Sequence, residues 1–405
     1  MPTERLYYDD AYTTRFTATP TRRGEHRGRP AIELAATYFY PESGGQLADR
    51  GSLGGARVID VQADEDGSVW HVIEGSADEG AFAAEVDWKR RFDSMQQHTG
   101  QHVLSAALER VAAAPTVSSH LGEERSSIEV EMGDVGWARV GEIEAAANAI
   151  VWEDRPIERH WITDSELSRY ALRKPPPAER EGSGGRIRIV EIPDWDVSAC
   201  GGTHTRRTGE VGVIKILRWE KVRGHLRFEF VCGARALEDH AWRTEALVEG
   251  ARRRTLKDRE LLAHLERAAA ERDELRKRLD ELSERLSLAE AKEKVGDPPR
   301  PVSDWSARRP REEARRFAIK CLEAGAPWAV IGTGAPDPVV VLGRAKTLGI
   351  DLKAIVPALL ERSGGRGGGS PDLVQASATG AEKAEAAWRW AVGELERATG
   401  ATPRS

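Results

Sequence analysis

Between Tyr7 and about Arg91, hydrophobic and polar positions alternate in short runs, which is typical of β-strands. Residues 31–34, 58–61 and 69–73 are the clearest of these runs, and glycine pairs such as Gly44–Gly45 separate them. Short strands divided by glycine-rich turns favour a small closed sheet. We therefore predict an N-terminal β-barrel domain over residues 1–92.

From about Asp93 the spacing becomes helical, and the apolar positions predict a helix over roughly residues 93–113 with Asp93 or Ser94 as its N-cap. Strands follow at 116–122 and 127–131, a helix at 140–152, a strand at 157–161 and a loop at 174–185. A strand at 187–192 and a hairpin of 211–216 with 226–231 complete the pattern. The fold class is therefore α+β, with an α+β domain over residues 93–245.

Over about residues 246–296 the apolar positions follow spacings of four and three, which is the seam of a coiled coil. Arg272 is its only polar member, and the seam needs a partner helix from a second chain or from the same chain. Asp297 and Pro298 end the helical pattern. The seam positions are Leu261, Leu265, Ala268, Arg272, Leu275, Leu279, Leu282, Leu286 and Ala289.

The last segment, residues 297–405, predicts a separate α/β domain with buried strands at 329–332 and 339–342. A glycine-rich loop is expected over residues 364–377. It lacks the Gly-Lys-Ser/Thr ending of a nucleotide-binding P-loop, which excludes that function. Its backbone amides would suit a phosphate group, and a flexible linker is the alternative.

The composition excludes some classes of protein. The charged fraction is 31%, and no apolar run approaches the roughly 18 residues of a membrane span. Residues 1–20 contain no signal-peptide core, so a cytoplasmic location without membrane association is expected. Three cysteines exclude a disulfide framework, and a net charge of −6 argues against indiscriminate binding to nucleic acid.

Two short motifs carry the strongest chemical signal. His98 and His102 are four residues apart, so a helix projects both from one face. Cys200 and His204 have the same separation. Three imidazoles and a thiolate form a full set of four zinc-type ligands. The absence of a glutamate directly after His98 excludes the His-Glu-x-x-His metallopeptidase motif.

Other polar positions are candidates for contact with a substrate. Thr37 and Gln46 flank the paired glycines near the middle of the predicted barrel, where they would direct polar groups into a pocket. A plain β-turn with a surface threonine is the alternative. His120, with Ser118 and Ser119, is a further candidate, and a satisfied strand histidine is the alternative for it. No Ser-His-Asp arrangement is visible.

Taken in order, the motifs resemble one family. Residues 37–46, 98–102, 116–122, 200–204 and 364–377 are similar to those of the long form of AlaX, a freestanding alanyl-tRNA editing protein. AlaX is related to the editing domain of alanyl-tRNA synthetase, and its long form carries a C-terminal DHHA1 domain. The resemblance covers nearly the whole chain, and so many separate motifs in one order make a chance match improbable.

The resemblance implies a hydrolase that removes wrongly attached serine or glycine from alanine tRNA. His98, His102, Cys200 and His204 would hold Zn²⁺, and Thr37 would sense the hydroxyl of serine. Residues 297–405 would be a DHHA1-like module for tRNA contact and dimerisation, with Arg366, Gly367, Gly368 and Gly369 as nucleic-acid-binding positions. A homodimer through the coiled coil or the C-terminal domain is expected.

The chain departs from the family pattern at a few positions. Ser43 replaces a common third glycine of the barrel motif, and Ser370 replaces a usual basic residue in the glycine-rich loop. Val374 and Ser377 replace smaller residues. Since the zinc-type motifs are intact, these departures weaken the tRNA contact more than the catalysis. A zinc-stabilised tRNA-binding or scaffolding protein without hydrolytic activity is the alternative function.

Overall fold

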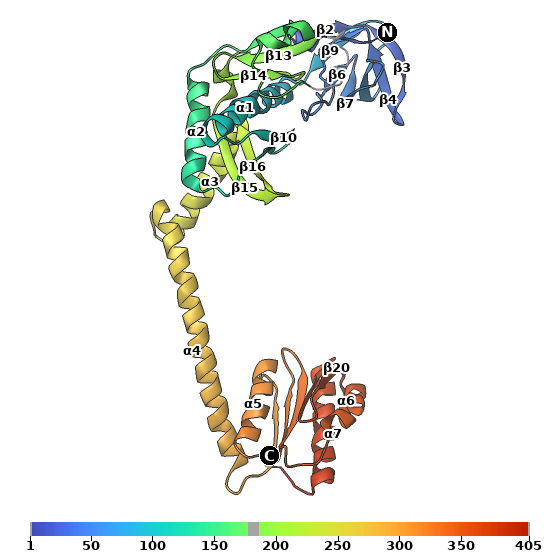
Figure 1. Cartoon of the computed structure of the whole chain (residues 1–405). Helices are drawn as coiled ribbons and strands as arrows, with labels where there is room; N and C mark the ends of the chain where they lie inside the picture. The colour runs from blue at the N-terminus through green and yellow to red at the C-terminus, as the bar shows by residue number, and fades with distance from the viewer. Residues whose placement is uncertain (1, 177–185, 404–405) are drawn as a thin grey trace. The chain divides into compact units, whose positions relative to one another are not determined.

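The computed structural model describes residues 2–176 and 186–403 (Figure 1). The chain forms two compact units, Met1–Arg253 and Arg254–Ser405, which are described separately below. Most of the loop predicted at residues 174–185 lies outside the described residues.

The N-terminal part of the first unit is a curled sheet of seven strands. The order is β2-β9-β6-β7-β8-β4-β3, and because the edge strands β2 and β3 do not pair, the sheet is a half-barrel rather than the closed barrel predicted. The sheet contributes to an apolar core that includes Leu34, Phe39 and Val61. The strands are β2 (Arg15–Ala18), β3 (Pro20–His26), β4 (Arg29–Leu34), β6 (Gly51–Leu53), β7 (Ala56–Ala63), β8 (Val69–Glu74) and β9 (Phe82–Val86).

A short additional ladder stands beside this sheet. Strand β1 (Glu4–Arg5) pairs in parallel with β5 (Ala36–Thr37), and Arg5 lies opposite Thr37. The 3-10 helix η1 (Leu6–Tyr8) follows β1. The ladder fixes the start of the segment 37–46, which the sequence singled out.

The α+β part of the first unit surrounds one central helix, α1 (Trp88–Ala112). Val103, Leu104 and Leu108 of α1 are fully buried in a core shared with α2 and with strands β11 and β16. The other elements are β10 (Thr116–Leu121), β11 (Ser126–Val130), α2 (Trp137–Trp152), β12 (Glu158–Ile162), η2 (Asp164–Arg169), β13 (Ile187–Ile192), β14 (Asp196–Ala199), η3 (Thr208–Val211), β15 (Ile214–Val222), β16 (His225–Cys232) and α3 (Ala234–Arg252).

These strands form two antiparallel sheets, ordered β10-β11-β16-β15 and β12-β13-β14. The predicted strand pair at 116–131 and the predicted hairpin of β15 and β16 are therefore both confirmed. The mixed α+β class is also confirmed.

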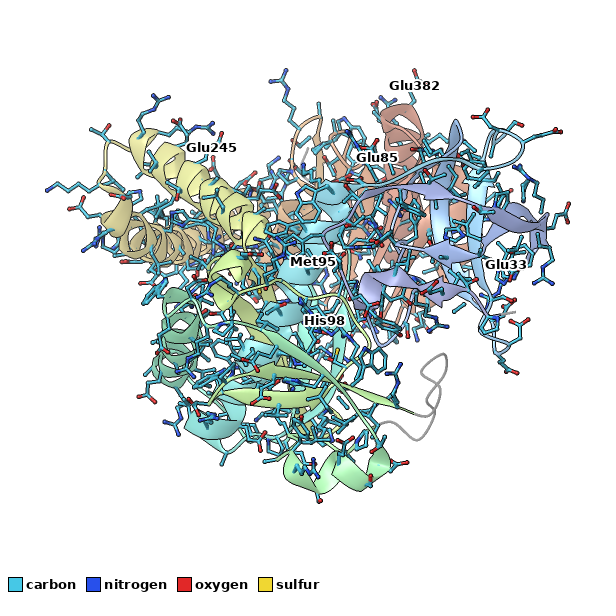
Figure 2. All side chains as sticks on the ribbon, turned by 90° about the horizontal axis from the view of Figure 1, so that it is seen from above. Glu33, Glu85, Met95, His98, Glu245 and Glu382 are labelled. Atoms are coloured by element: carbon cyan, nitrogen blue, oxygen red, sulfur yellow. The ribbon has the colours of Figure 1, made fainter. Side chains whose placement is uncertain are left out.

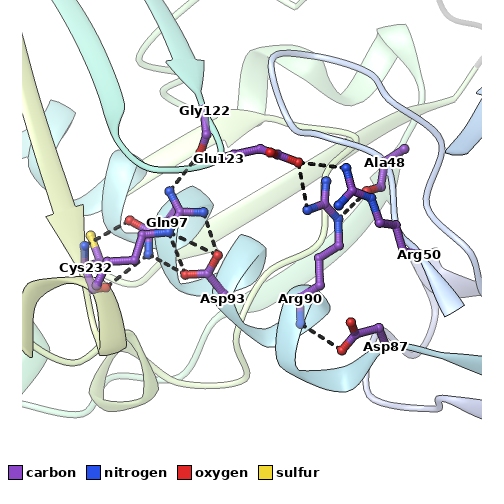
Figure 3. A network of polar contacts seen from close by, with 10 residues as sticks. Ala48, Arg50, Asp87, Arg90, Asp93, Gln97, Gly122, Glu123 and Cys232 are labelled. Carbon is purple, nitrogen blue, oxygen red and sulfur yellow. Dashed lines mark hydrogen bonds and ion pairs between the residues drawn. The ribbon is translucent and has the colours of Figure 1, made fainter. Parts of the chain in front are cut away.

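Helix α1 begins five residues earlier than predicted. Its N-cap is Asp87, whose side chain accepts a hydrogen bond from the Arg90 N–H at 3.2 Å. The predicted cap Asp93 lies inside the helix, where it forms an ion pair with Arg235 at 2.6 Å (Figure 3). A carboxylate one and a half turns into the helix was thus mistaken for a cap, because its partner is remote in sequence.

The first turns of α1 are tied to several surrounding segments (Figure 3). Gln97 exchanges two hydrogen bonds with the backbone of Cys232, at 2.9 and 3.0 Å. Arg90 donates to the Ala48 carbonyl at 2.9 Å and to Glu123 at 3.2 Å. These contacts join the helix to strand β16, to the half-barrel and to the turn after β10. These contacts consequently hold α1 in a fixed position.

A buried ion pair adds to this attachment. Arg91 of α1 and Asp49 of the half-barrel are both almost completely inaccessible. Arg91 also donates to the Ala11 carbonyl at 2.7 Å, and Asp49 accepts from the Tyr40 N–H at 2.6 Å. Because both charges are buried and hydrogen-bonded, removal of either partner would be strongly destabilising.

The second unit is a five-stranded sheet with helices on both faces. The strand order is β17-β18-β19-β21-β20, with β17 parallel to β18 and the remaining pairs antiparallel. Alternate residues of β18 enter two different cores, Ile331 with α5 and Val330 with α6 and α7. The elements are η4 (Asp258–Glu260), α4 (Leu261–Val295), β17 (Val302–Ser306), α5 (Arg311–Glu323), β18 (Trp328–Thr333), β19 (Val339–Arg344), η5 (Leu352–Ile355), α6 (Val356–Ser363), β20 (Gly364–Gly369), β21 (Leu373–Ala378) and α7 (Ala381–Thr399).

The glycine-rich segment predicted as a loop forms strands instead. Residues 364–369 make the edge strand β20, which pairs with β21. A β-carbon at Gly367 would collide with the Gln375 carbonyl oxygen, so glycine is what allows β20 to lie this close to its neighbour. Backbone pairing thus overrode a composition that is typical of loops.

The predicted coiled-coil segment is divided. Helix α3 ends at Arg252 in the first unit, and the seam belongs to the single helix α4. The end of α4 packs on α5 through Ala291 and Val295, whereas the side chains of Leu275, Leu279, Leu282 and Leu286 are each at least 55% exposed. The described chain therefore leaves most of the seam uncovered.

No helix among the described residues is long and apolar enough to cross a membrane.

Candidate metal centre

His98 and His102 lie on α1, where every residue from Met95 to Leu108 is buried. Figure 2 shows Met95 and His98 on this helix. His98 is 5% exposed and His102 4%. Because the helix is held by its core face and by its N-terminal contacts, both imidazoles have fixed positions.

Cys200 and His204 come from the loop that follows β14. Arg188, which is buried, donates hydrogen bonds to the carbonyls of Cys200 at 2.9 Å and Gly202 at 3.0 Å. Arg159 donates to the His204 carbonyl at 2.9 Å. A β-carbon at Gly202 would overlap the His98 ring, so only glycine lets the loop close on the helix.

The four side chains converge on one point. The donor atoms of His98, His102, Cys200 and His204 all lie within 4.8 Å of one another. The Cys200 Sγ is 3.3 Å from the His98 Nε2 and 3.2 Å from the His204 Nε2. The edge of a tetrahedron with ordinary Zn–N and Zn–S bonds is roughly 3.5 Å. The donor set and its spacing therefore fit a tetrahedral zinc ion.

Each histidine of the cluster is oriented through its other ring nitrogen. The Nδ1 of His98 lies 2.8 Å from the Gln46 Oε1, and that of His102 lies 2.9 Å from the Asp196 Oδ2. The Nδ1 of His204 lies 3.2 Å from the Thr99 hydroxyl. With Nδ1 engaged in this way, Nε2 is left to face the shared point. In metal-binding histidines a hydrogen bond at the other ring nitrogen generally orients the ring in the same way.

The electrostatics favour the thiolate that a metal requires. Burial raises the pKa of the Cys200 thiol, but the nearby His98 and His204 rings outweigh it and hold that pKa well below its usual range. Burial opposes the charge on His102, yet hydrogen bonds to Asp196 and Cys200 raise its pKa to about 9. Burial instead holds the pKa of His204 well below its usual range. A thiolate at Cys200 beside a protonated His102 is thus favoured, and deprotonation of the ligands would accompany metal binding.

Comparisons with known proteins show which family the chain resembles. A family model, the threonyl and alanyl tRNA synthetase second additional domain, matches residues 187–228, which include Cys200 and His204. The alanyl-tRNA editing protein AlaX-L of Pyrococcus horikoshii is 29% identical over 397 aligned residues, covering 92% of this chain and 94% of the relative. The predicted resemblance to the AlaX long form is confirmed.

Alanine–tRNA ligases are similar to the chain as well. That of Pyrobaculum neutrophilum is 34% identical and that of Halobacterium salinarum 32%, with 92% and 94% of this chain covered. The chain spans only 42% and 43% of those ligases, so it corresponds to part of them. The solved C-Ala domain of the Aquifex aeolicus alanyl-tRNA synthetase matches 24% of this chain and 88% of its own length, with 21% identity and a TM-score of 0.21.

Thr37 and Gln46, the polar residues at the two ends of segment 37–46, lie in different settings. Gln46 is fully buried beside the cluster, where its Oε1 accepts from the His98 ring and from the Thr203 N–H at 3.1 Å. Thr37 is also fully buried, but its hydroxyl contacts His71 at 2.8 Å and the Phe39 N–H at 3.0 Å. The structure therefore joins Gln46 directly to a candidate ligand and Thr37 to the half-barrel.

His120 lies on β10 with its side chain exposed. The end of β10 contacts segment 37–46 through the backbone, since the Leu121 N–H donates to the Gly45 carbonyl at 3.0 Å. Two motifs that are far apart in sequence therefore lie side by side. The predicted nucleic-acid-binding positions lie in β20 of the second unit and are Arg366, Gly367, Gly368 and Gly369.

Several site residues escaped the sequence analysis. Asp196 and Cys200 share one face of an extended segment, a pattern of period two that offered a signal. Thr99 lies inside the His98–His102 motif and could have been included for that reason. No local pattern marked Arg188 or His71, because their partners are remote in sequence.

Proposed function

We propose that this chain is a hydrolase that deacylates mischarged alanine tRNA, with seryl and glycyl esters as substrates. One observation carries the proposal. A complete zinc-type ligand set of three buried histidines and one partly buried cysteine, with all three histidines oriented through Nδ1, lies in a chain that is similar along almost its whole length to an AlaX-L editing protein. Such a site would act on the ester that joins the amino acid to the terminal ribose.

Zn²⁺ held by His98, His102, Cys200 and His204 would supply a fixed positive charge that polarises or orients a polar group of the substrate. The protein holds its own ligands in place: Gln46 fixes the His98 ring, and Asp196 fixes the His102 ring. An aminoacyl ester is already activated, so positioning next to a water molecule provides much of the required acceleration.

Selectivity would reside in Thr37. A buried hydroxyl can form a hydrogen bond with serine that alanine cannot form, and a correctly attached alanine would leave that hydroxyl with an unused acceptor site. The contacts of this hydroxyl are with His71 and with the backbone of Phe39.

The decisive experiment compares the hydrolysis of serine-charged, glycine-charged and alanine-charged alanine tRNA, with and without a zinc chelator. Fast loss of serine or glycine that the chelator abolishes, with alanine spared, is the expected result. Bound zinc without turnover on either wrong ester would contradict the proposal.

That second outcome would support a zinc-stabilised tRNA-binding or scaffolding protein. The observation in its favour is the closed set of four protein ligands, because zinc sites of this kind are usually structural. Metal content alone does not separate the two functions, whereas turnover does.

We also propose that the second unit contacts tRNA as a DHHA1-like module. Arg366 is exposed on edge strand β20, and its backbone is held in place by Ser377, whose hydroxyl donates to the Arg366 carbonyl at 2.8 Å. Arg366→Ala would weaken tRNA binding and reduce the salt dependence by about one phosphate contact. Arg389→Ala, on the exposed face of α7, is a matched control for loss of one positive charge.

The uncovered leucines of α4 support a homodimer. Four seam leucines from Leu275 to Leu286 are at least 55% exposed, and a coiled coil with a second copy would bury them. Sedimentation of the wild type and of a Leu279→Glu, Leu282→Glu double variant tests this proposal. A wild-type monomer at micromolar concentration would contradict it.

A further inference from the structure

His71 is a buried polar residue of the half-barrel. It lies in the centre of β8, between β4 and β7, opposite Ile32 on one side and Val61 on the other. Its side chain is completely inaccessible. Both ring nitrogens have a partner: Nδ1 lies 3.0 Å from the Ile32 carbonyl oxygen and Nε2 lies 2.8 Å from the Thr37 hydroxyl.

The Ile32 contact determines where the ring proton is. A carbonyl oxygen only accepts hydrogen bonds, so the Nδ1 of His71 must carry hydrogen. Burial lowers the pKa of His71 to about 4, and no charged group is among the causes of this shift. The ring is thus neutral near pH 7, and its Nε2 has a lone pair and no proton.

The state of the ring in turn fixes the direction of the Thr37 hydroxyl. Since Nε2 can only accept, the hydroxyl donates its single proton to His71. The Phe39 N–H donates to the same oxygen at 3.0 Å. One lone pair of the Thr37 oxygen remains, and it can only accept a hydrogen bond.

We propose that His71 is a positioning residue for substrate selectivity, which holds the Thr37 hydroxyl as a hydrogen-bond acceptor for the hydroxyl of a seryl ester. This inference rests on the proposed editing function. A serine side chain donates to the remaining lone pair, whereas a glycyl ester has no group to place there. An alanyl ester would set a methyl group against an unpaired acceptor. His71 therefore determines that Thr37 favours a substrate group that donates a hydrogen bond.

Thr37 is connected to the metal centre by its own chain segment. Residues 37–46 run from the β5 position beside β1 to Gln46, which contacts the His98 ring. The segment therefore has Thr37 at one end and, at the other, the amide that contacts the metal centre.

Two substitutions of His71 separate the two ring contacts. His71→Asn keeps an amide N–H near the position of Nδ1, where it can still donate to Ile32, but removes the acceptor that faces Thr37. His71→Gln instead places an amide oxygen near the position of Nε2 and so retains that acceptor. Val61→Ala creates a cavity at the position on β7 that pairs with His71. It is the control for an effect of lost stability alone.

The test is single-turnover hydrolysis, by these variants, of alanine tRNA charged with serine or with glycine. We expect His71→Asn to lower the ratio of seryl to glycyl rates by about three- to tenfold, the range for one neutral hydrogen bond. His71→Gln restores much of the ratio, and Val61→Ala leaves it unchanged. In a Thr37→Val background, His71→Asn causes no further change, because the two residues act as one unit.

Other outcomes overturn the inference. An unchanged ratio in His71→Asn, or an equal loss on both esters, would show that His71 has only a structural role. Nitrogen-15 NMR of the His71 ring tests the tautomer without any activity measurement, and a proton on Nε2 near pH 7 would also refute the inference. If the wild type hydrolyses neither ester, the editing function itself fails, and this result is distinct from hydrolysis with an unaltered ratio.

Discussion

The metal centre and the Thr37–His71 pair are two buried histidine sites with opposite arrangements. In the metal centre each histidine uses Nδ1 for a protein partner and leaves Nε2 toward the other ligands. In the half-barrel His71 uses both nitrogens within the protein. The first arrangement leaves three lone pairs available to a metal, whereas the second leaves none.

Charge separates the two sites as well. Asp196 and the Cys200 thiolate raise the pKa of His102 to about 9 in spite of burial. His71 has only a carbonyl and a hydroxyl for partners, and burial lowers its pKa to about 4. Equal burial thus produces opposite shifts, and the partners decide the direction.

The largest expected effect comes from breaking the metal centre. Cys200→Ala removes the only thiolate of the ligand set, so zinc binding and ester hydrolysis should both be lost, by more than the roughly 100-fold typical of outer partners. Metal analysis and deacylation assays measure this. Cys321→Ala, which removes a buried cysteine of the second unit, should retain both. Full activity of the Cys200 variant would show that the thiolate is dispensable.

The His71 site should make the folding stability depend on pH in the acid range. The unfolded chain protonates His71 near pH 6.5, but the folded chain does so only near pH 4. The unfolded state therefore binds more protons between these values, and stability falls as pH decreases from 6.5 to 4. The loss attributable to His71 is up to about 3 kcal/mol.

This loss is measured as the difference between wild type and His71→Gln in chemical unfolding at several pH values. Both proteins are studied without metal, so that protonation of the ligands contributes equally. Parallel pH dependences of the two proteins would show that His71 is not held neutral in the folded state.

A smaller effect is expected from the partner of His102. Asp196→Asn keeps the size of the side chain but removes its charge, so zinc affinity should fall by about 10- to 100-fold. Competition with a chelating dye measures the affinity. Ser198→Ala is the matched control, because Ser198 donates to the same carboxylate oxygen at 2.9 Å without touching the histidine. An equal effect of the two substitutions would assign the role to general packing.

The smallest effect concerns substrate choice. Thr37→Val removes one hydroxyl at nearly constant volume, and the preference for seryl over alanyl ester should fall by about tenfold or less. Thr37→Ser keeps the hydroxyl and should retain the preference. Unchanged selectivity in Thr37→Val, measured as the ratio of the two deacylation rates, would remove Thr37 from substrate recognition.

The sequence by itself determined the elements with regular periodicity and the identity of the metal-type ligands. His98 with His102, and Cys200 with His204, are detectable because helix and loop spacings are local properties of the chain. The strands 31–34, 58–61 and 69–73 were predictable from alternation for the same reason, and so was the long helix α4.

Only the tertiary structure decided which residues meet. Composition made residues 364–369 look like a loop, but pairing with β21 makes them an edge strand. Asp93 has the residue type of a helix cap, but in the structure it pairs with Arg235, which is remote in sequence. The Gln46–His98 and Thr37–His71 contacts join residues 52 and 34 positions apart. No local pattern encodes such contacts, because they depend on how strands and helices pack once they have formed.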